Sequence, residues 1–467
     1  MFPFEVKYPE DRIAVMTDNG SIFTFGDIVD FTEKIRELIP DRCLLFCLSQ
    51  NTVGSLFGYI SFLSNSFVPV MLNSDINSDF LEVLINTYRP QYLWLPDNRN
   101  NEFANYQVVF SAHNYSLVKL EEKNSFALNP DLAILLTTSG STGSSKWVRI
   151  SYENLKSNTE SISSFLSIDE QERPITSLPM WYAYGLSIIN CHLFKGATIL
   201  LTSKTIVEKD FWNFFKSREA SSFSGVPYTY QILKKLKFSE MSLPSLKTLT
   251  QAGGKLNNEL NIYFSEYALN SDKRFFVMYG QTEATARMSF LPPEYAIEKL
   301  GSIGLPLPDC EFVLVDDYGN EIQEIDRVGE LVYKGKNVSM GYCKSGDDLL
   351  KCDENNGVLF TGDLAKKDAD NFYYITGRKN RDIKLFGNRI NLDEMENLLT
   401  NIITDCACTG SNDNLSVFIT DKTRVVEIKN FISFKTGIHP SAFSVKYCNE
   451  IPKNTVGKIN YSMLESL

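Results

Sequence analysis

Apolar runs along the chain alternate with segments of mixed polarity, and this pattern predicts strands that alternate with helices. The run Cys43–Leu48 predicts a buried strand, Thr52–Leu63 a helix and Val68–Leu72 the next strand. Further on, the apolar residues Ile134–Leu136 predict the end of another buried strand. This order of elements is typical of α/β proteins built in layers.

Two hydroxyl residues predict where helices begin. Thr24 is followed three residues later by Asp27, which predicts a capping box at the start of a helix. Ser151 is well placed to cap a helix that continues to about Phe165. The sequence therefore predicts one helix that follows Thr24 and runs to about Ile39, and another that follows Ser151.

The pattern changes after Gly301, where short strands are separated by Gly, Asp and Asn turns. Glu311–Val315, Gly329–Lys334 and Phe372–Thr376 each predict such a strand. We therefore expect a small β-barrel-like unit in this part of the chain. The sequence contains no internal repeat and no low-complexity segment.

The segment from Asp131 to Val148 carries the clearest chemical signal. After the apolar run, nearly every residue is Ser, Thr or Gly, and the segment closes on a lysine. Glycines let the backbone approach a ligand closely, and hydroxyl and ammonium donors suit phosphate groups. A Walker-type P-loop is excluded because Ser145 stands where that motif requires Gly. By themselves, these residues fit an ordinary polar surface loop equally well.

Five segments resemble, in order and type, the motifs of one family, the adenylate-forming (ANL) superfamily of acyl-CoA synthetases, luciferases and peptide-synthetase adenylation domains. They are TSGSTGSSK (138–146), MYGQTEA (278–284), YKGKNVSMGY (333–342) with FTGD (360–363), GRKNRDIKLFGNRINLDEME (377–396) and PKNTVGKI (452–459). The resemblance covers nearly the whole chain. It implies an α/β fold with a large multi-layer N-terminal AMP-binding domain, residues 1–379, and a small mobile α+β C-terminal domain, residues 380–467. Asn380 replaces the usual hinge Asp or Lys, and the C-terminal domain is compact for the family.

The reaction that this resemblance implies is carboxylate activation. A carboxylate oxygen attacks the α-phosphorus of ATP, and a thiol of CoA or of a carrier protein's phosphopantetheine then displaces AMP. Stabilisation of charge dominates such a reaction over proton transfer. The chain has only three histidines, of which His113 and His439 lie outside the motifs and His192 is expected to be a core residue.

The resemblance also implies the site residues. Glu283 would bind Mg²⁺, Thr282 the α-phosphate and Lys458 the reacting carboxylate and phosphate oxygens, with Lys146 as a further catalytic cation. The nucleotide-binding residues would be Thr138, Ser139, Gly140, Ser141, Thr142, Gly143, Gly253, Gly254, Tyr279, Gly280, Gln281, Thr282, Asp363 and Arg378. Individually, each has an ordinary structural reading: a Thr-Glu helix cap, a glycine turn, a surface turn charge or a solvated lysine.

The acid substrate is less well specified by the sequence. Leu178–Leu200 follows the family's pattern but has no Asp to bind an α-ammonium, which disfavours an α-amino acid. An aromatic cluster is a candidate pocket for a modest acyl or aryl acid, although such clusters are more often core. Its members are Trp181, Tyr182, Tyr184, Val226 and Tyr228, and Arg287 is a candidate to recognise a second polar group of the acid.

Composition and charge limit the class of protein, its partners and its location. The 467 residues, 43% hydrophobic and 22% charged, suggest a globular protein of two or more domains. A net charge of −11 argues against nucleic acid as a partner. No signal peptide or membrane span is expected, and nine scattered cysteines predict a cytoplasmic protein with reduced thiols. An unrelated ATP-dependent kinase is disfavoured, because the sequence lacks the Walker and kinase motifs. A second alternative stays open, namely a nucleotide-binding relative that has lost catalysis and acts as an interaction protein.

Overall fold

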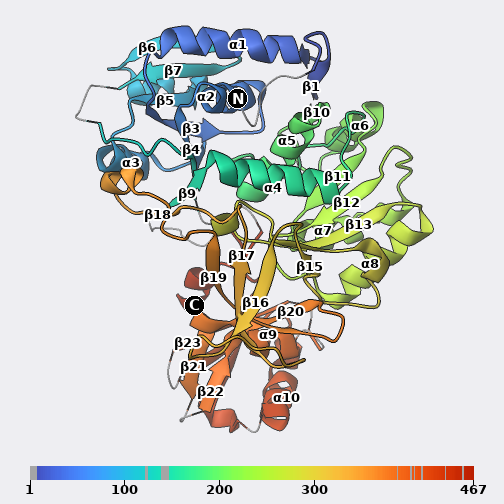
Figure 1. Cartoon of the computed structure of the whole chain (residues 1–467). Coiled ribbons are helices and arrows are strands. Elements are labelled where there is room, and N and C mark those ends of the chain that lie inside the picture. Colours follow the sequence, from blue (N-terminus) through green and yellow to red (C-terminus); the bar gives the residue numbers. More distant parts are fainter. Residues whose placement is uncertain are drawn as a thin grey trace.

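The computed structural model describes residues 8–120, 125–137, 147–385, 388–399, 402–403, 405–411, 414–436, 438–454 and 457–466. The chain forms a large N-terminal part and a small C-terminal part, which lies at the bottom of Figure 1. The exact division at residues 379 and 380 stays a prediction.

The largest sheet has eight strands, with parallel strands at its centre and antiparallel strands at both edges. Its order is β18 (Gly341–Cys343), β9 (Trp147–Ser151), β8 (Leu132–Thr137), β4 (Val68–Asn73), β3 (Leu44–Ser49), β5 (Tyr92–Pro96), β7 (Tyr115–Lys119) and β6 (Gln107–Ala112). The strands predicted near residues 43, 68 and 134 are confirmed in β3, β4 and β8.

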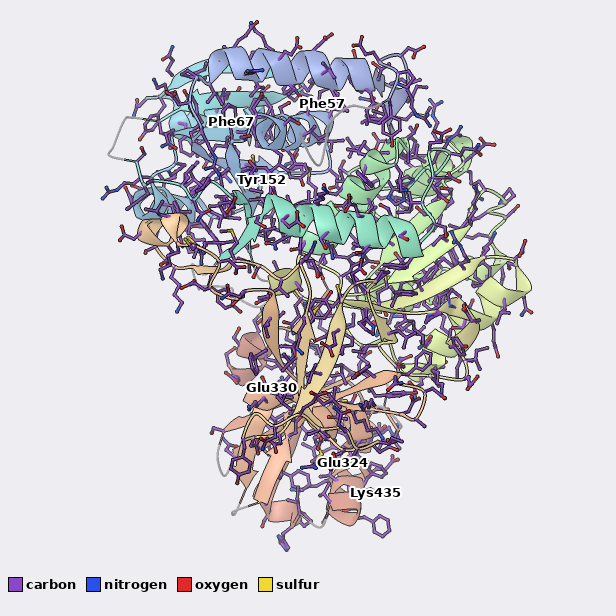
Figure 2. All side chains as sticks on the ribbon, viewed as in Figure 1. Phe57, Phe67, Tyr152, Glu324, Glu330 and Lys435 are labelled. Carbon is purple, nitrogen blue, oxygen red and sulfur yellow. The ribbon has the colours of Figure 1, made fainter. Side chains whose placement is uncertain are left out.

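Helices cover both faces of this sheet. Successive residues of β3 alternate between two cores, so that Leu45 packs with α1 (Phe25–Leu38) and α2 (Val53–Ser64), whereas Phe46 packs with α3 (Ser78–Tyr88). Phe57 of α2, which is labelled in Figure 2, contacts Phe31 of α1 edge-on, with ring centroids 5.5 Å apart. The predicted capping box is confirmed at the start of α1.

A second sheet of five strands lies beside the first. Its order is β11 (Ser222–Gly225), β12 (Thr248–Gln251), β13 (Arg274–Tyr279), β14 (Ser289–Leu291) and β15 (Leu305–Pro306), and the first three strands are parallel. Its outer face is covered by α6 (Lys209–Ser217), α7 (Pro227–Lys235) and α8 (Asn258–Asn270). A three-stranded sheet of β10 (Ile199–Leu201), β1 (Ile13–Thr17) and β2 (Ile22–Thr24) adjoins both.

Helices α4 (Tyr152–Phe165) and α5 (Ala183–Phe194) pack together between the two large sheets (Figure 1). Ser151 caps α4, as predicted, because its Oγ accepts a hydrogen bond of 3.0 Å from the backbone N–H of Asn154. His192 of α5 is a satisfied core histidine: Nδ1 lies 2.7 Å from the Ile188 carbonyl, and burial lowers its pKa to about 4. This confirms the expectation that it is not a base.

The strands predicted after Gly301 form a four-stranded antiparallel sheet. Its order is β16 (Glu311–Val315), β17 (Gly329–Lys334), β19 (Val358–Lys367) and β20 (Tyr373–Arg378). The C-terminal part contains the hairpin β21 (Asp382–Leu385) with β22 (Asn388–Asn391), the sheet β23 (Cys406–Ser411), β24 (Asn414–Ile419) and β25 (Phe443–Tyr447), and helices α9 (Leu392–Leu399), α10 (Val425–Thr436) and α11 (Tyr461–Glu465).

The structure also bears on the predictions about cysteines and membrane spans. All nine cysteine thiols are free. In the part of the chain that the structure describes, no helix has both the length and the apolar character needed to cross a membrane.

Candidate active site

The predicted site residues gather at one edge of the second sheet. β11, β12 and β13 are parallel, so their carboxyl ends meet at the same edge, where open α/β sheets bind ligands. Val226, Gly253 and Tyr279 follow or end these three strands. The topology therefore collects residues from three separate sequence segments.

A strained turn follows β13 and fixes the segment that carries Glu283. Thr285 and Ala286 have φ values of +57° and +97°, a conformation that residues with a Cβ rarely adopt. The Ala286 carbonyl lies directly against Gly280, and a Cβ at Gly280 would stand 1.9 Å from its oxygen. Only glycine fits at position 280, and the turn holds Glu283 at the sheet edge.

Asp363 is the centre of a buried hydrogen-bond network. Its carboxylate accepts hydrogen bonds from the Tyr279 hydroxyl at 2.5 Å, from Gln281 Nε2 at 2.9 Å and from Arg378 Nε at 3.1 Å. Asp363 is only 3% exposed, which excludes its reading as a solvated turn charge. Burial and the nearby Asp363 carboxylate raise the pKa of Tyr279 well above its usual value, so its hydroxyl stays protonated and donates.

Glu283 is oriented by a residue to which the sequence analysis assigned no role. The Tyr342 hydroxyl, from β18, donates to Glu283 Oε1 at 2.8 Å, and Ser339 N–H donates to the Glu283 carbonyl at 2.8 Å. Burial, together with the Glu283 carboxylate, raises the pKa of Tyr342. Tyr342 is the last residue of the motif YKGKNVSMGY (333–342), and only this membership in a family motif could have indicated a role for it. Thr282 is buried beside Glu283 in the 3-10 turn Thr282–Ala284.

Lys458 reaches this site from the C-terminal part. Burial lowers its pKa to about 8; the Arg378 cation also lowers it, whereas Glu283 and Asp363 raise it. The four charged groups therefore share one electrostatic environment although they come from four different segments. Lys458 is half-buried, which argues against its reading as a solvated surface lysine.

The loop that carries Lys458 contacts the N-terminal part directly. Gly457, with φ of +77°, lies against Val226 and Tyr228. Lys453 Nζ lies 4.6 Å from the centroid of the Tyr228 ring and 3.3 Å from Gln231 Oε1. The loop thus packs on the first turn of α7, beside the carboxyl end of β11.

Most of the aromatic cluster is buried together. Tyr182, Tyr184 and Val226 belong to one core cluster, and Trp181 packs against it. Gly253, with φ of +84°, lies so close to the Tyr182 hydroxyl that a Cβ would stand 2.7 Å from it; Gly254 is the next residue. Tyr228 differs, because it is 43% exposed at the contact with the C-terminal loop.

The two remaining predictions concern the hinge residue Asn380 and the phosphate loop. Asn380 lies in the 3-10 turn Lys379–Arg381 between β20 and β21. The predicted phosphate loop lies outside the described residues, and with it Thr138, Ser139, Gly140, Ser141, Thr142, Gly143 and Lys146.

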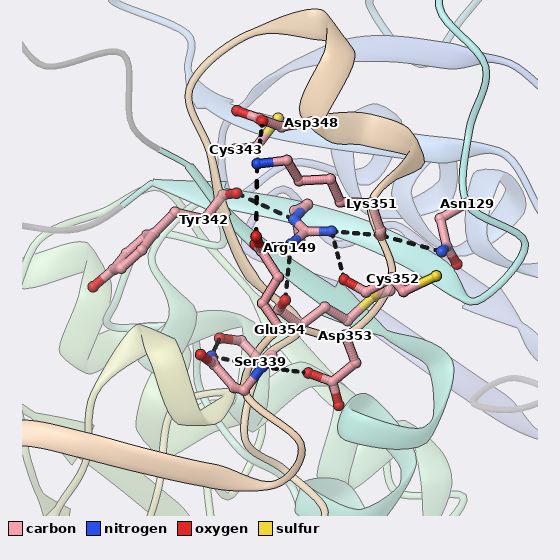
Figure 3. A network of polar contacts seen from close by, with 12 residues as sticks. Asn129, Arg149, Ser339, Tyr342, Cys343, Asp348, Lys351, Cys352, Asp353 and Glu354 are labelled. Carbon is pink, nitrogen blue, oxygen red and sulfur yellow. Dashed lines mark hydrogen bonds and ion pairs between the residues drawn. The ribbon is translucent and has the colours of Figure 1, made fainter.

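A fully buried arginine, Arg149, fixes β18 to β9 (Figure 3). The Arg149 guanidinium donates to the carbonyls of Tyr342, Lys351, Cys352 and Met340, and its Nη2 lies 2.5 Å from the Glu354 carboxylate. Each nitrogen of the guanidinium has an acceptor, and the charge is paired. Arg149 therefore positions the strand that carries Tyr342.

Arg287 is equally buried but has no such partners. It is 1% exposed, and Nε and Nη1 have no hydrogen-bond acceptor. Its guanidinium carbon lies 5.0 Å from the centroid of the Tyr184 ring. Such a contact contributes roughly 0.5–2 kcal/mol. An unpaired buried charge costs several kcal/mol, so the ring alone does not offset the burial.

Comparison with known proteins identifies the family. The model of the AMP-binding enzyme family matches residues 44–343. The 2-succinylbenzoate–CoA ligase of Bacillus velezensis is 30% identical over 416 residues, which cover 86% of this chain and 83% of that ligase. A long-chain-fatty-acid–CoA ligase of Escherichia coli O6:H1 is 28% identical over 70% of this chain, but the match spans only 60% of that ligase.

Solved structures show the same fold over nearly the whole chain. The o-succinylbenzoate CoA synthetase (MenE) of Bacillus subtilis, in complex with an acyl-adenylate, superimposes with a TM-score of 0.79, 22% identity and coverage of 97% and 95% of the two chains. ATP-bound MatB of Rhodopseudomonas palustris superimposes with a TM-score of 0.79 and 18% identity. The match covers 99% of this chain and 97% of MatB. The chain belongs to the AMP-binding enzyme family, and the predicted superfamily and α/β fold are confirmed.

Proposed function

We propose that this protein is an AMP-forming acid–thiol ligase, which activates a small carboxylic acid with ATP and transfers the acyl group to a thiol. The observation that carries the proposal is that Lys458, on the C-terminal loop, lies near enough to Glu283, Asp363 and Arg378 for their charges to act on its pKa. Two anionic reactants, a carboxylate and a phosphate, need cations and a metal ion at their point of contact. The site provides two cations, Lys458 and Arg378, and for a metal ion the half-buried carboxylate of Glu283.

The geometry supports a definite orientation for ATP. The Asp363 carboxylate, already supplied with donors by Tyr279 and Gln281, suits a ribose, and the Tyr279 ring offers a face for the adenine. Phosphates extending along the sheet edge would run toward Glu283 and Thr282, with the loop from Thr138 to Lys146 as their expected cradle.

Glu283 fits a Mg²⁺ ion that ATP brings with it. Magnesium typically takes one or two protein carboxylates together with substrate phosphates. Tyr342 holds one oxygen of Glu283 in a fixed direction through its hydrogen bond of 2.8 Å. A single oriented carboxylate is thus enough, and the ion would neutralise charge on the phosphates.

In the first half-reaction, a carboxylate oxygen attacks the α-phosphorus, and pyrophosphate leaves. The Lys458 ammonium would stabilise the charge that develops between the two oxygens. In the second, a thiol attacks the acyl carbon and AMP leaves. We propose that CoA or a carrier-protein phosphopantetheine supplies the thiol, in the cytoplasm, after the C-terminal part has turned about the segment near Asn380.

The activities of the relatives support the proposal, since the relatives named above are CoA ligases. The test is release of pyrophosphate when the protein is mixed with Mg-ATP and a panel of carboxylic acids, followed by addition of CoA. We expect release with at least one acid and formation of its thioester. Nucleotide binding without release for any acid would favour the catalytically impaired interaction protein instead.

A further inference from the structure

Arg287 is a buried positive charge for which the described residues supply no counterion. Among the described residues, Arg287 forms no ion pair, and its Nε and Nη1 are buried without an acceptor. Arg149 shows what this chain does with a buried guanidinium that has only a structural role: four carbonyls and one carboxylate surround it (Figure 3). Arg287 has the same burial and lacks such partners.

The charge of Arg287 shifts the pKa of three described neighbours, Tyr184, Cys191 and His192. None of the three neutralises it. Burial raises the pKa of Tyr184 and raises that of Cys191 to about 11, so both are uncharged at neutral pH. Burial lowers the pKa of His192 to about 4, so it is neutral as well. No residue in the described part of the chain supplies the missing anion, and this points to a ligand as its source.

The position of Arg287 indicates which ligand brings that anion. It lies four positions after Glu283, and the strained turn at Thr285 and Ala286 lies between them. Its guanidinium lies over the ring of Tyr184, which packs in one cluster with Tyr182 and Val226. Arg287 thus lies against the aromatic cluster whose member Tyr182 contacts Gly253.

We infer that Arg287 binds a second anionic group of the acid substrate, so that the protein activates dicarboxylic acids or comparable acids with two negative groups. The inference rests on the ligase function proposed above. One carboxylate would lie near Lys458 and react with ATP, while the other would pair with the planar fork of the guanidinium, which suits two parallel hydrogen bonds to a carboxylate. Arg287 is then a specificity-determining residue and takes no part in the chemistry.

The test compares each dicarboxylic acid of a series of increasing chain length with its own half-methyl ester. The two acids differ in one charge and have nearly the same shape. Acid-dependent exchange of pyrophosphate into ATP measures the activation of each. We expect the wild-type protein to prefer the diacid of one chain length over its ester by about thirtyfold or more in kcat/KM, which corresponds to roughly 2 kcal/mol.

Three variants assign that preference to Arg287. Arg287→Met should abolish the preference for the diacid while keeping exchange with the ester, and Arg287→Lys should restore part of it. Arg274→Met is the matched control, because Arg274 also lies over a ring, that of Phe276 at 5.7 Å, but at the opposite end of β13. It should leave the preference unchanged.

A second measurement is independent of catalysis. Removing an unpaired buried charge should raise the melting temperature of the ligand-free protein in Arg287→Met, whereas the diacid should raise that of the wild type alone. A lower melting temperature in Arg287→Met, with the diacid preference intact, would show a structural arginine and overturn the inference.

The other outcomes separate this inference from the ligase function. Exchange with esters at least as good as with diacids would refute the second anionic group and leave the ligase function standing. An increase in the KM for ATP with every acid in Arg287→Met would assign the arginine to the nucleotide phosphates and refute it too. Absence of exchange with every acid would refute the ligase function, and calorimetric binding of the diacid would then decide the anion site.

Discussion

The protonation of Lys458 gives the most quantitative prediction. Burial and the Arg378 cation lower its pKa from 10.5 to about 8, against the opposing effect of Glu283 and Asp363. A pKa unit corresponds to about 1.4 kcal/mol, so the docked arrangement disfavours the ammonium by roughly 3 kcal/mol. Because the pKa is lowered, this cost is present below about pH 8 and disappears as the pH rises toward the ordinary lysine value.

The same value sets the pH dependence of adenylation. With a pKa of about 8, the lysine is about 90% charged at pH 7 and about 10% charged at pH 9. We therefore expect kcat/KM for adenylation, which reports the free enzyme, to fall about tenfold between these pH values. Bound ATP adds negative charge beside the ammonium, so the fall in kcat should lie at higher pH.

The assay is pyrophosphate release from pH 6.5 to 9.5 for the wild type and for Lys458→Arg. Arginine stays charged over this range, so the variant should be slower but should lose the alkaline fall. A flat profile for the wild type would refute the assignment. An identical fall in Lys458→Arg would place the titrating group elsewhere.

Three further predictions follow from the site geometry. Lys458→Ala should reduce formation of acyl-AMP by about a hundredfold or more but leave single-turnover transfer from supplied acyl-AMP to the thiol nearly unchanged; equal losses would mean that the lysine is structural. Glu283→Gln should lower adenylation by about a hundredfold to a thousandfold, most strongly at limiting Mg²⁺, and Tyr342→Phe by less, because it removes only the orienting hydrogen bond; near-wild-type pyrophosphate release by Glu283→Gln would contradict the metal role. Gly280→Ala should lower the free energy of unfolding by about 1–3 kcal/mol, because the new Cβ meets the Ala286 backbone carbonyl, and an unchanged denaturation midpoint would show that the turn relaxes.

The sequence by itself determined the order and type of the elements and the family. Glu311–Val315 and Gly329–Lys334 were predicted at the bounds that β16 and β17 have, and the caps at Thr24 and Ser151 were also correct. These features depend on neighbours a few residues apart, which the sequence shows directly. The last predicted strand, Phe372–Thr376, instead runs to Arg378, because Arg378 pairs with Asp363 across the sheet.

Only the tertiary structure decided which charges are buried and which of them are paired. Asp363 accepts hydrogen bonds from Tyr279 and Gln281, which lie more than 80 residues earlier in the chain. No local sequence pattern predicts these contacts. The sequence does not distinguish Arg149 from Arg287. In the structure, hydrogen-bond acceptors surround Arg149, whereas Nε and Nη1 of Arg287 have none. Pairing depends on distant segments that the fold brings together, and the free energy of a buried charge depends on that pairing.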